Sequence, residues 1–288
     1  MEYTITVARL DEVKICLSDT PVDTTTDIVE WDSCTYTTTL TGTYPLQVKE
    51  LNSSISGRYL IMQSTVGTEG FGLANVEVHG TTISVSHNNI TYGTVSSAST
   101  GRVWLDRNLG ASRVCTELND TACYGDYYQF GRDKDGHEDN GSATTTILAD
   151  DVDTVGDGNF ITNGAIPSDW ASVDVDGAIR STNWSKTDGT SICPTGYRVP
   201  TVAEFTAETT GEGINNNIDA FNSFLKLSSS GYRNNAAILN GQGSYGFYWT
   251  PTPDSNSLVA SRFGFLSGSV GASSGTRVDG FTVRCIKD

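Results

Sequence analysis

The sequence predicts a mixed α+β protein with few helices and many short strands, preceded by an all-β module. Composition is the first indication: the helix formers Lys, Glu, Gln and Met are scarce, while Thr, Val, Tyr and Ser are abundant. Strand-like alternation, the second, dominates the first 96 residues. The third is that helical patterns are short and occur late in the chain. A chain of 288 residues accommodates two domains, and we place them at residues 1–96 and 97–288.

Alternating sequence defines the predicted all-β module. Tyr3–Ala8 alternates as a half-buried strand does, and Val13–Leu17 repeats the pattern before a run of turn residues. Tyr59–Met62 and Val76–Val78 predict further strands. Because no helical pattern occurs in this module, we expect an all-β structure.

Two stretches of this module resemble a known family. Val13–Pro21 (VKICLSDTP) and Gly57–Gly80 (GRYLIMQSTVGTEGFGLANVEVHG) are similar to the closing part of discoidin or galactose-binding-like β-sandwiches. The early segment of that family, which carries its ligand loops, has no counterpart in this sequence. The resemblance therefore implies a partial discoidin-like module without assigning a sugar site, and we expect a structural or assembly role for it.

Helical patterns occur at two places in the second domain. Pro200–Thr209 predicts one helix, because Thr201 is a suitable N-cap and Glu204 lies where it completes a capping box. Phe205 would then face inward. Ala220–Leu227 predicts the second helix. Short strands and Gly-rich turns are expected from there to the C-terminus.

Loops and isolated aromatic residues dominate the rest of this domain. Ser97–Thr100 is a linker of small residues, and Asp133–Thr190 has little periodicity and predicts an extended loop or insertion. Trp104, Trp249 and Phe281 are large apolar residues in polar sequence. We expect these three to anchor the core rather than to contact a ligand.

The net charge of −16 narrows the class of partner. An acidic chain repels phosphate backbones and anionic membrane surfaces, so nucleic acid and membrane insertion are not expected. The acidity indicates either a well-solvated surface or loops that hold Ca²⁺. No apolar run is long enough to cross a bilayer, and residues 1–20 lack the apolar region of a signal peptide. We therefore expect that a signal was removed or that the chain reaches the outside by another route, such as a released virus particle.

Cysteine usage favours an oxidising, extracellular environment. None of the six cysteines forms a CxxC pair, so zinc-ribbon spacing is absent, and an even count in a loop-rich chain suits disulfides. The expected pairs are Cys16–Cys34, Cys115–Cys123 and Cys193–Cys285, with other connectivities open. The alternative is buried free thiols in a reducing cytoplasm.

Five motifs in the second domain line up in order with a known fold. They are VWLDRNLGAS at Val103–Ser112, YGDYYQFGRDKDGHE at Tyr124–Glu138, ICPTGYRVPTVAEF at Ile192–Phe205, FYWTPTP at Phe247–Pro253 and GFTVRCIKD at Gly280–Asp288. Together they resemble the C-type-lectin-like fold of the Fibrobacter succinogenes major paralogous domain, a relative of the formylglycine-generating-enzyme type. The arrangement also resembles the variable proteins of diversity-generating retroelements. The resemblance covers nearly all of residues 101–288.

The retroelement resemblance implies a diversified C-terminal surface. In residues 262–266, period-two alternation puts Phe263 and Phe265 on an inward face, with Arg262, Gly264 and Leu266 opposite. Lys, Glu, Gln and Met are absent between Trp249 and Thr276. Adenine-directed mutagenesis of Asn codons would produce this absence, because such codons end in a pyrimidine. Tolerant surface loops are the alternative. The implied variable, ligand-binding positions are Tyr245, Phe247, Asp254, Asn256, Ser261, Arg262, Gly264, Leu266, Ser269, Gly271, Ser273, Ser274, Gly275, Thr276 and Asp279.

Metal and catalytic motifs are weak. Residues 133–140 (DKDGHEDN) resemble the start of a Ca²⁺ loop with candidate ligands Asp133, Asp135 and Asp139, but Thr144 occupies the position of the bidentate Glu, so a solvated turn is the alternative. The three histidines lack zinc spacing, and no nucleophile elbow, P-loop or dinucleotide fingerprint occurs. Enzymes related to the resembled fold use a reactive cysteine pair, whereas the cysteines here are expected to be structural. We therefore expect no enzymatic activity and no cofactor other than calcium.

Three functions are compatible with the sequence. The first is a non-enzymatic protein of a virion or cell surface that binds a protein or glycan on a target cell through its diversified segment. The second is a carbohydrate-binding or adhesion module of fixed specificity, and the third is a structural surface protein. Self-association would add avidity to weak individual sites.

Overall fold

The structure is a computed structural model that describes six strands between residues 3 and 80 by their backbone, and residues 84–166, 168–254 and 259–288 in full. It forms two compact units, residues 1–83 and 84–288. In all it contains three α-helices and many strands in several sheets among these residues, so the α+β class predicted from the sequence is correct.

The described elements of the first unit are strands in two antiparallel sheets. One sheet has the order β4 (Gln47–Glu50), β1 (Tyr3–Val7), β6 (Val78–Gly80), and the other β3 (Tyr36–Leu40), β2 (Val13–Ser18), β5 (Tyr59–Ser64). The strands predicted at Tyr3–Ala8, Val13–Leu17 and Tyr59–Met62 are confirmed. The expected Cys16–Cys34 disulfide lies outside the described side chains.

The second unit begins earlier than the expected domain boundary. Residues 84–96 form β7 (Val85–His87), β8 (Ile90–Tyr92) and β9 (Thr94–Ser96), which belong to this unit. Two contacts explain why. Tyr92 is fully buried in the core of the second unit, and Val95 of β9 pairs with Trp104 of the next strand.

A sheet joins the beginning and the end of the second unit. Its order is β14 (Tyr197–Arg198), β21 (Ile286–Lys287), β10 (Val103–Leu105), β9, and Trp104 lies opposite Ile286. A second sheet contains β11 (Tyr128–Gln129), β20 (Gly280–Phe281), β15 (Tyr232–Arg233) and β16 (Leu239–Asn240). β12 (Thr144–Thr145) and β13 (Phe160–Ile161) form a short parallel pair.

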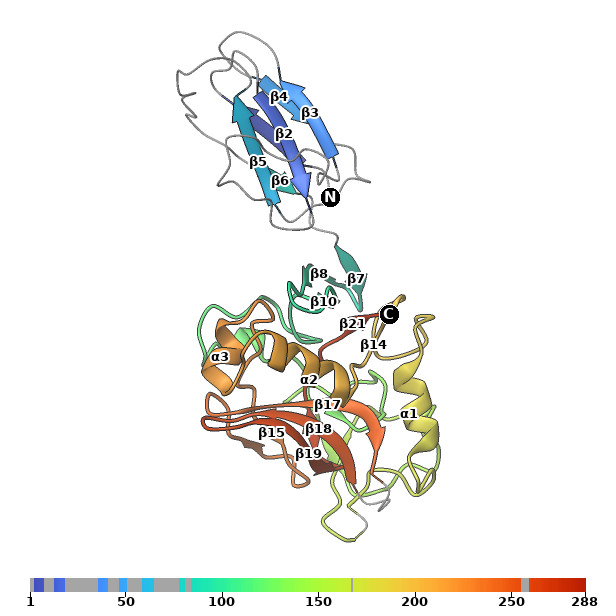
Figure 1. Cartoon of the computed structure of the whole chain (residues 1–288). Coiled ribbons are helices and arrows are strands. Elements are labelled where there is room, and N and C mark those ends of the chain that lie inside the picture. The colour runs from blue at the N-terminus through green and yellow to red at the C-terminus, as the bar shows by residue number, and fades with distance from the viewer. Residues whose placement is uncertain are drawn as a thin grey trace. The chain divides into compact units, whose positions relative to one another are not determined.

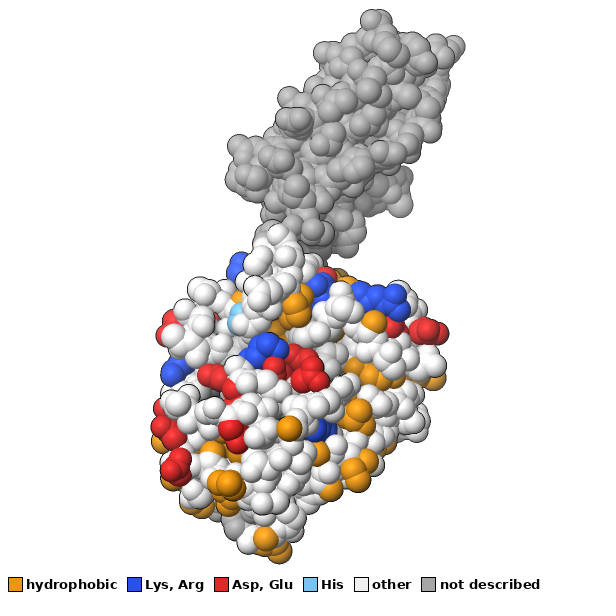
Figure 2. All heavy atoms as spheres, turned by 180° about the vertical axis from the view of Figure 1, so that it is seen from behind, with side chains coloured by type: hydrophobic (Ala, Val, Ile, Leu, Met, Phe, Trp, Pro, Cys, Tyr) orange, Lys and Arg blue, Asp and Glu red, His pale blue; other side chains and the backbone are white. Residues whose placement is uncertain are grey.

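The third sheet consists of three long consecutive strands, β17 (Gly246–Pro253), β18 (Val259–Phe265) and β19 (Val270–Thr276). Helix α2 (Val202–Gly211) packs on one of its faces through β18 and β19, and α1 (Ala178–Ser185) lies beside β17 (Figure 1). On the face of the molecule drawn in Figure 2, hydrophobic side chains form small separate groups within a mostly polar surface.

Helix α2 forms as its sequence predicts. The Thr201 hydroxyl accepts a hydrogen bond from the backbone N–H of Glu204, and the Glu204 carboxylate accepts one from the N–H of Thr201 (2.8 Å), which completes the capping box. Phe205 is fully buried and stacks on Phe263, with 5.1 Å between ring centroids. The helix is therefore fastened to the sheet by its inward aromatic residue.

The second predicted helix is shifted. Helix α3 spans Asn217–Asn222 rather than Ala220–Leu227, because the Asn216 side chain caps it by accepting from the N–H groups of Ile218 and Asp219. It does not continue to Leu227, since Lys226 has a positive φ of 47°.

The prediction of an extended loop over Asp133–Thr190 is wrong in part, because the segment contains α1 and the β12–β13 pair. The Asp174 carboxylate accepts hydrogen bonds from the backbone N–H groups of Ile179 (2.9 Å) and Arg180 (3.2 Å), and so begins α1. Trp184 of α1 is fully buried against Phe130. The helix is thus held by an acid that precedes it by several residues and by one aromatic residue, not by a periodic apolar stripe.

The predicted core anchors and two predicted disulfides are confirmed. Trp104, Trp249 and Phe281 are all fully buried, and the rings of Trp249 and Phe281 lie 4.5 Å apart. Disulfides join Cys115 to Cys123 and Cys193 to Cys285. The second links residues 92 positions apart and brings the chain end to the core.

Candidate ligand-binding face

The two faces of the β17–β18–β19 sheet have different environments. Phe263 and Phe265 of β18 are buried, with their ring centroids 5.1 and 6.3 Å from that of Phe205 in α2. Because side chains alternate along a strand, Arg262 and Gly264 lie on the opposite face. The predicted inward position of the two phenylalanines is therefore confirmed. We call the face that carries Arg262 the open face.

The open face contains a hollow of about 410 Å³. We call it the Arg262 hollow. Seven of its eight lining residues are among the implied variable positions. The lining residues are Tyr232, Tyr245, Phe247, Arg262, Ser274, Gly275, Thr276 and Asp279. The one that sequence reasoning missed is Tyr232 of β15, because its strand is remote from the C-terminal segment and only the fold brings it to this place.

Aromatic rings form the base of the hollow, and Arg262 lies on them. The Arg262 guanidinium carbon is 3.7 Å from the ring centroid of Phe247 and 4.7 Å from that of Phe281. Its Nε donates to the hydroxyl of Ser273 at 3.3 Å. Burial lowers the pKa of Arg262, while the charge of Asp279 acts to raise it. The guanidinium is thus a partly desolvated, fixed plane.

Two glycines make room for this stack. A Cβ on Gly275 would lie 2.4 Å from Cε2 of Phe281 and 3.2 Å from Cδ of Arg262. A Cβ on Gly264 would lie 2.9 Å from Cε1 of Phe247. Both glycines are buried although they were expected to be open to ligand, because the aromatic rings cover them. Phe247, also an implied variable position, is buried as well.

Asp279 provides the negative charge of the hollow. Its carboxylate accepts a hydrogen bond from the hydroxyl of Thr276. Burial raises the pKa of Asp279, while the hydrogen bond from Thr276 and the charge of Arg262 act to lower it. The hollow therefore holds one cation and one anion on an aromatic base, within reach of the hydroxyl groups of its walls.

Among the described residues, the other implied positions do not line the hollow, and Gly271 lines the pocket on the α2 side of the sheet instead. Asp254 accepts a hydrogen bond from the Ser274 hydroxyl at 3.2 Å, and the carbonyl of Ser261 accepts one from the Thr250 hydroxyl. Leu266 and Ser269 flank the turn between β18 and β19, where Leu266 N–H donates to Ser269 O. Gly271 and Ser273 are on β19. Asn256 lies outside the described residues.

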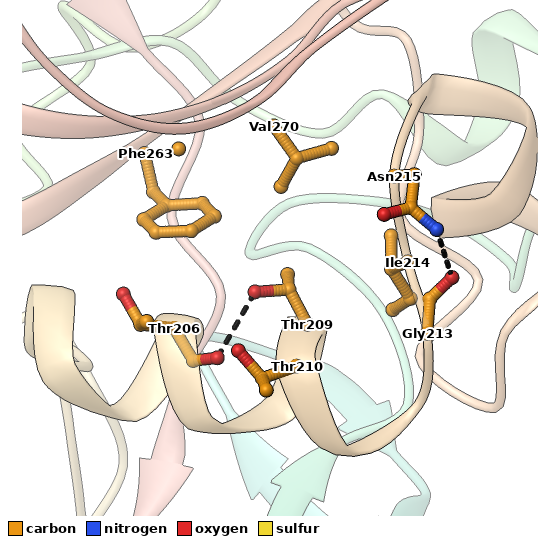
Figure 3. A pocket seen from close by; sticks show the side chains of 9 residues that line it. Thr206, Thr209, Thr210, Gly213, Ile214, Asn215, Phe263 and Val270 are labelled. Carbon is orange, nitrogen blue, oxygen red and sulfur yellow. Dashed lines mark hydrogen bonds between the residues drawn. The ribbon is translucent and has the colours of Figure 1, made fainter.

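A second pocket of about 400 Å³ lies on the α2 side of the sheet (Figure 3). Phe263 and Val270 face the threonines of α2 across it. Three of its polar side chains have partners within the chain: Thr206 donates to Val202 O at 2.8 Å, Thr209 to Thr206 O at 3.1 Å and Asn215 to Gly213 O at 2.7 Å. We assign no binding role to it.

The predicted calcium ligands do not converge. Among the described residues, the acids and histidines close enough to share a metal ion are Asp135, His137 and Glu138, without Asp133 and Asp139. Asp135 accepts hydrogen bonds from Nη2 of Arg132 and from Nδ1 of His137, both at 2.7 Å. A metal ion at Asp135 would have to displace these donors.

His137 is instead part of a buried network. Nδ1 donates to Asp135, and Nε2 accepts a hydrogen bond from the backbone N–H of Gln129 at 3.1 Å, which requires the neutral ring. Burial lowers the pKa of His137, and the hydrogen bond to Asp135 opposes that shift. For Asp133, the first of the three predicted calcium ligands, burial raises the pKa of the carboxyl group to about 6.

Comparison of the chain with family models, curated proteins and solved structures finds no match. None of the helices in the described part of the chain is long and apolar enough to cross a membrane. Function is therefore inferred from the geometry of the open face.

Proposed function

We propose that the chain is a non-enzymatic binding protein that contacts its ligand through the open face of the β17–β18–β19 sheet. One observation carries this proposal: seven positions singled out from the sequence line the same hollow. Convergent polar groups over an aromatic base are typical of ligand sites.

In this proposal the second unit is a C-type-lectin-like scaffold whose C-terminal segment is diversified by a retroelement. The supporting feature is that some residues of the sheet are buried and fix it in place, whereas others are exposed. Phe263 and Phe265 hold it to α2, and the Cys193–Cys285 disulfide holds the chain end, while Ser273, opposite Arg262, is exposed, as are Ser269 and Ser274. Substitutions at exposed positions are usually close to neutral for stability, so such a face tolerates change.

The residue types of the open face fit adaptable recognition. Tyr, Ser, Gly and Asn are the residues that paratopes use, because tyrosine offers a large contact area at a low entropic cost and serine offers adaptable hydrogen bonds. Tyr232, Tyr245, Ser273 and Ser274 have this character. The proposed partner is a protein or glycan on a target cell surface, and oligomerisation would raise avidity.

The proposed location is the outside of a cell or virion. Two disulfides in the second unit are typical of proteins that live in an oxidising environment. The partial discoidin-like module would then serve attachment or assembly.

Deep sequencing of this gene from a population of its source tests the proposal. We expect variation concentrated at the codons of those implied positions between Tyr245 and Asp279 that are not buried, with Trp249, Phe263 and Cys285 unchanged. A template repeat near the gene, differing from its last codons at adenines, should accompany it. A uniform sequence would refute diversification, and glycan binding that survives deletion of residues 84–288 would move the binding site to the first unit.

A further inference from the structure

Arg262 is held in place but keeps unused donors. Its Nε is bonded to Ser273, and its plane lies on Phe247 and Phe281. Within the described residues, neither of its two terminal amino groups donates a hydrogen bond to a protein atom, and neither is buried without a partner, so both face the hollow or solvent.

This sets Arg262 apart from the arginines of the interior. Arg284 donates to Leu225 O (2.7 Å) and to the side chain of Asn108, and Arg180 donates to the carboxylates of Asp169 and Asp174. Those guanidinium groups hold the fold together. A planar guanidinium with two free amino groups is instead suited to hold a carboxylate through two parallel hydrogen bonds.

The tyrosines of the wall also keep free hydroxyl groups. Tyr232 and Tyr245 pack beside each other, with ring centroids 6.4 Å apart. In the described part of the chain, neither hydroxyl has a protein partner, and neither is buried. The hollow therefore offers two aromatic surfaces with hydrogen-bonding groups at their edges.

Asp279 restricts which carboxylate the hollow accepts. A ligand with several adjacent acids would be repelled by Asp279 and by a chain of net charge −16. A ligand with one carboxylate and several hydroxyl groups suits both charged residues of the hollow, because its carboxylate pairs with Arg262 and its hydroxyls donate to Asp279. The volume of about 410 Å³ lies in the range of small-ligand sites.

We propose that the Arg262 hollow binds a sugar acid, with the sugar carboxylate on Arg262, ring hydroxyls on Asp279, and the ring against Tyr232 and Tyr245. This ligand class rests on the proposed binding function of the open face and names its chemistry for this chain.

The test is an NMR titration of the full chain with three probes: glucuronic acid, glucose and acetate. Glucose keeps the ring and hydroxyls but lacks the carboxylate, and acetate has only the carboxylate. The readout is the side-chain Nε–Hε resonance of Arg262, assigned by its loss in Arg262→Lys. We expect glucuronic acid to shift it and to bind at least tenfold more tightly than either of the other probes.

Two variants complete the test. Arg262→Lys keeps the charge but loses the planar pair of donors, so we expect about tenfold weaker binding of glucuronic acid. Because this variant lacks the Arg262 resonance, its binding and that of the parent are compared through the backbone amide resonances of Gly275 and Asp279, which line the hollow. The matched control is Arg113→Lys, an exposed arginine paired with Asp120, which should bind as the parent does. Equal shifts with glucose or acetate, no shift with glucuronic acid, or unchanged binding by Arg262→Lys would overturn the sugar-acid site. Population sequencing is independent of this result, so the failure of one proposal is distinguishable from the failure of the other.

Discussion

The Cys193–Cys285 disulfide should stabilise the second unit more than Cys115–Cys123 does, because it closes a much longer loop. The two bridges span 92 and 8 residues. In the loop-entropy treatment these lengths correspond to about 4.6 and about 2.5 kcal/mol, a difference of about 2 kcal/mol. Replacing both members of each pair by alanine removes the same atoms in each variant, so much of the truncation cost cancels in the comparison.

Urea unfolding followed by tryptophan fluorescence measures this difference. Four of the five tryptophans, Trp104, Trp170, Trp184 and Trp249, are fully buried in the second unit and report on it. We expect the double alanine variant at Cys193 and Cys285 to lose about 2 kcal/mol more of the free energy of unfolding than the variant at Cys115 and Cys123. Equal losses, or a larger loss for the short loop, would refute the loop-length reasoning.

Four further changes have defined outcomes. Thr201→Ala removes the capping box of α2 and should cost about 1 kcal/mol by urea unfolding, whereas an unchanged midpoint would contradict the cap. Gly275→Ala should cost about 1–3 kcal/mol by overpacking, with Gly268→Ala, which meets nothing within 4 Å, as the near-neutral control. The pKa of His137 is lowered in the folded state, so its contribution is complete above its unfolded pKa and is lost as the pH falls below about 6.5; His137→Gln should flatten that part of the stability profile. A chelator should leave the melting temperature unchanged, and a fall would show that a metal ion stabilises the fold.

Local signals explain which elements could be predicted. The capping box of α2 is written in adjacent residues, and the alternation of β1, β2 and β5 is equally local. Helix α1 has no such pattern: its N-cap residue is Gly177, which has no side chain to cap it, and the acceptor for its first turn is Asp174, outside the helix. The sequence did not predict α1 because tertiary contacts, rather than the helix propensity of its residues, stabilise this helix.

The same distinction applies to the candidate site. Seven residues of the Arg262 hollow come from one stretch of chain, so strand periodicity and family resemblance were enough to group them. Tyr232 was missed because only the fold brings it there. The sequence also could not predict that Phe247 packs over Gly264, because that contact depends on the register between β17 and β18. The calcium hypothesis relied on the spacing of the acids alone. Spacing could not reveal that the Asp135 carboxylate accepts hydrogen bonds from Arg132 and His137.

The continuity of β17, β18 and β19 along the chain has a practical meaning for protein engineering. Since seven of the eight lining residues of the hollow are encoded between Tyr245 and Asp279, a single synthetic DNA cassette can exchange them at once. The cassette must keep Trp249, Phe263 and Phe265, which are buried in the core. Phe205 in α2, the partner of Phe263, and the cysteine Cys193 are encoded upstream and stay unchanged. Under the proposed function, the binding specificity of the unit could then be exchanged while the residues that fix the sheet are kept.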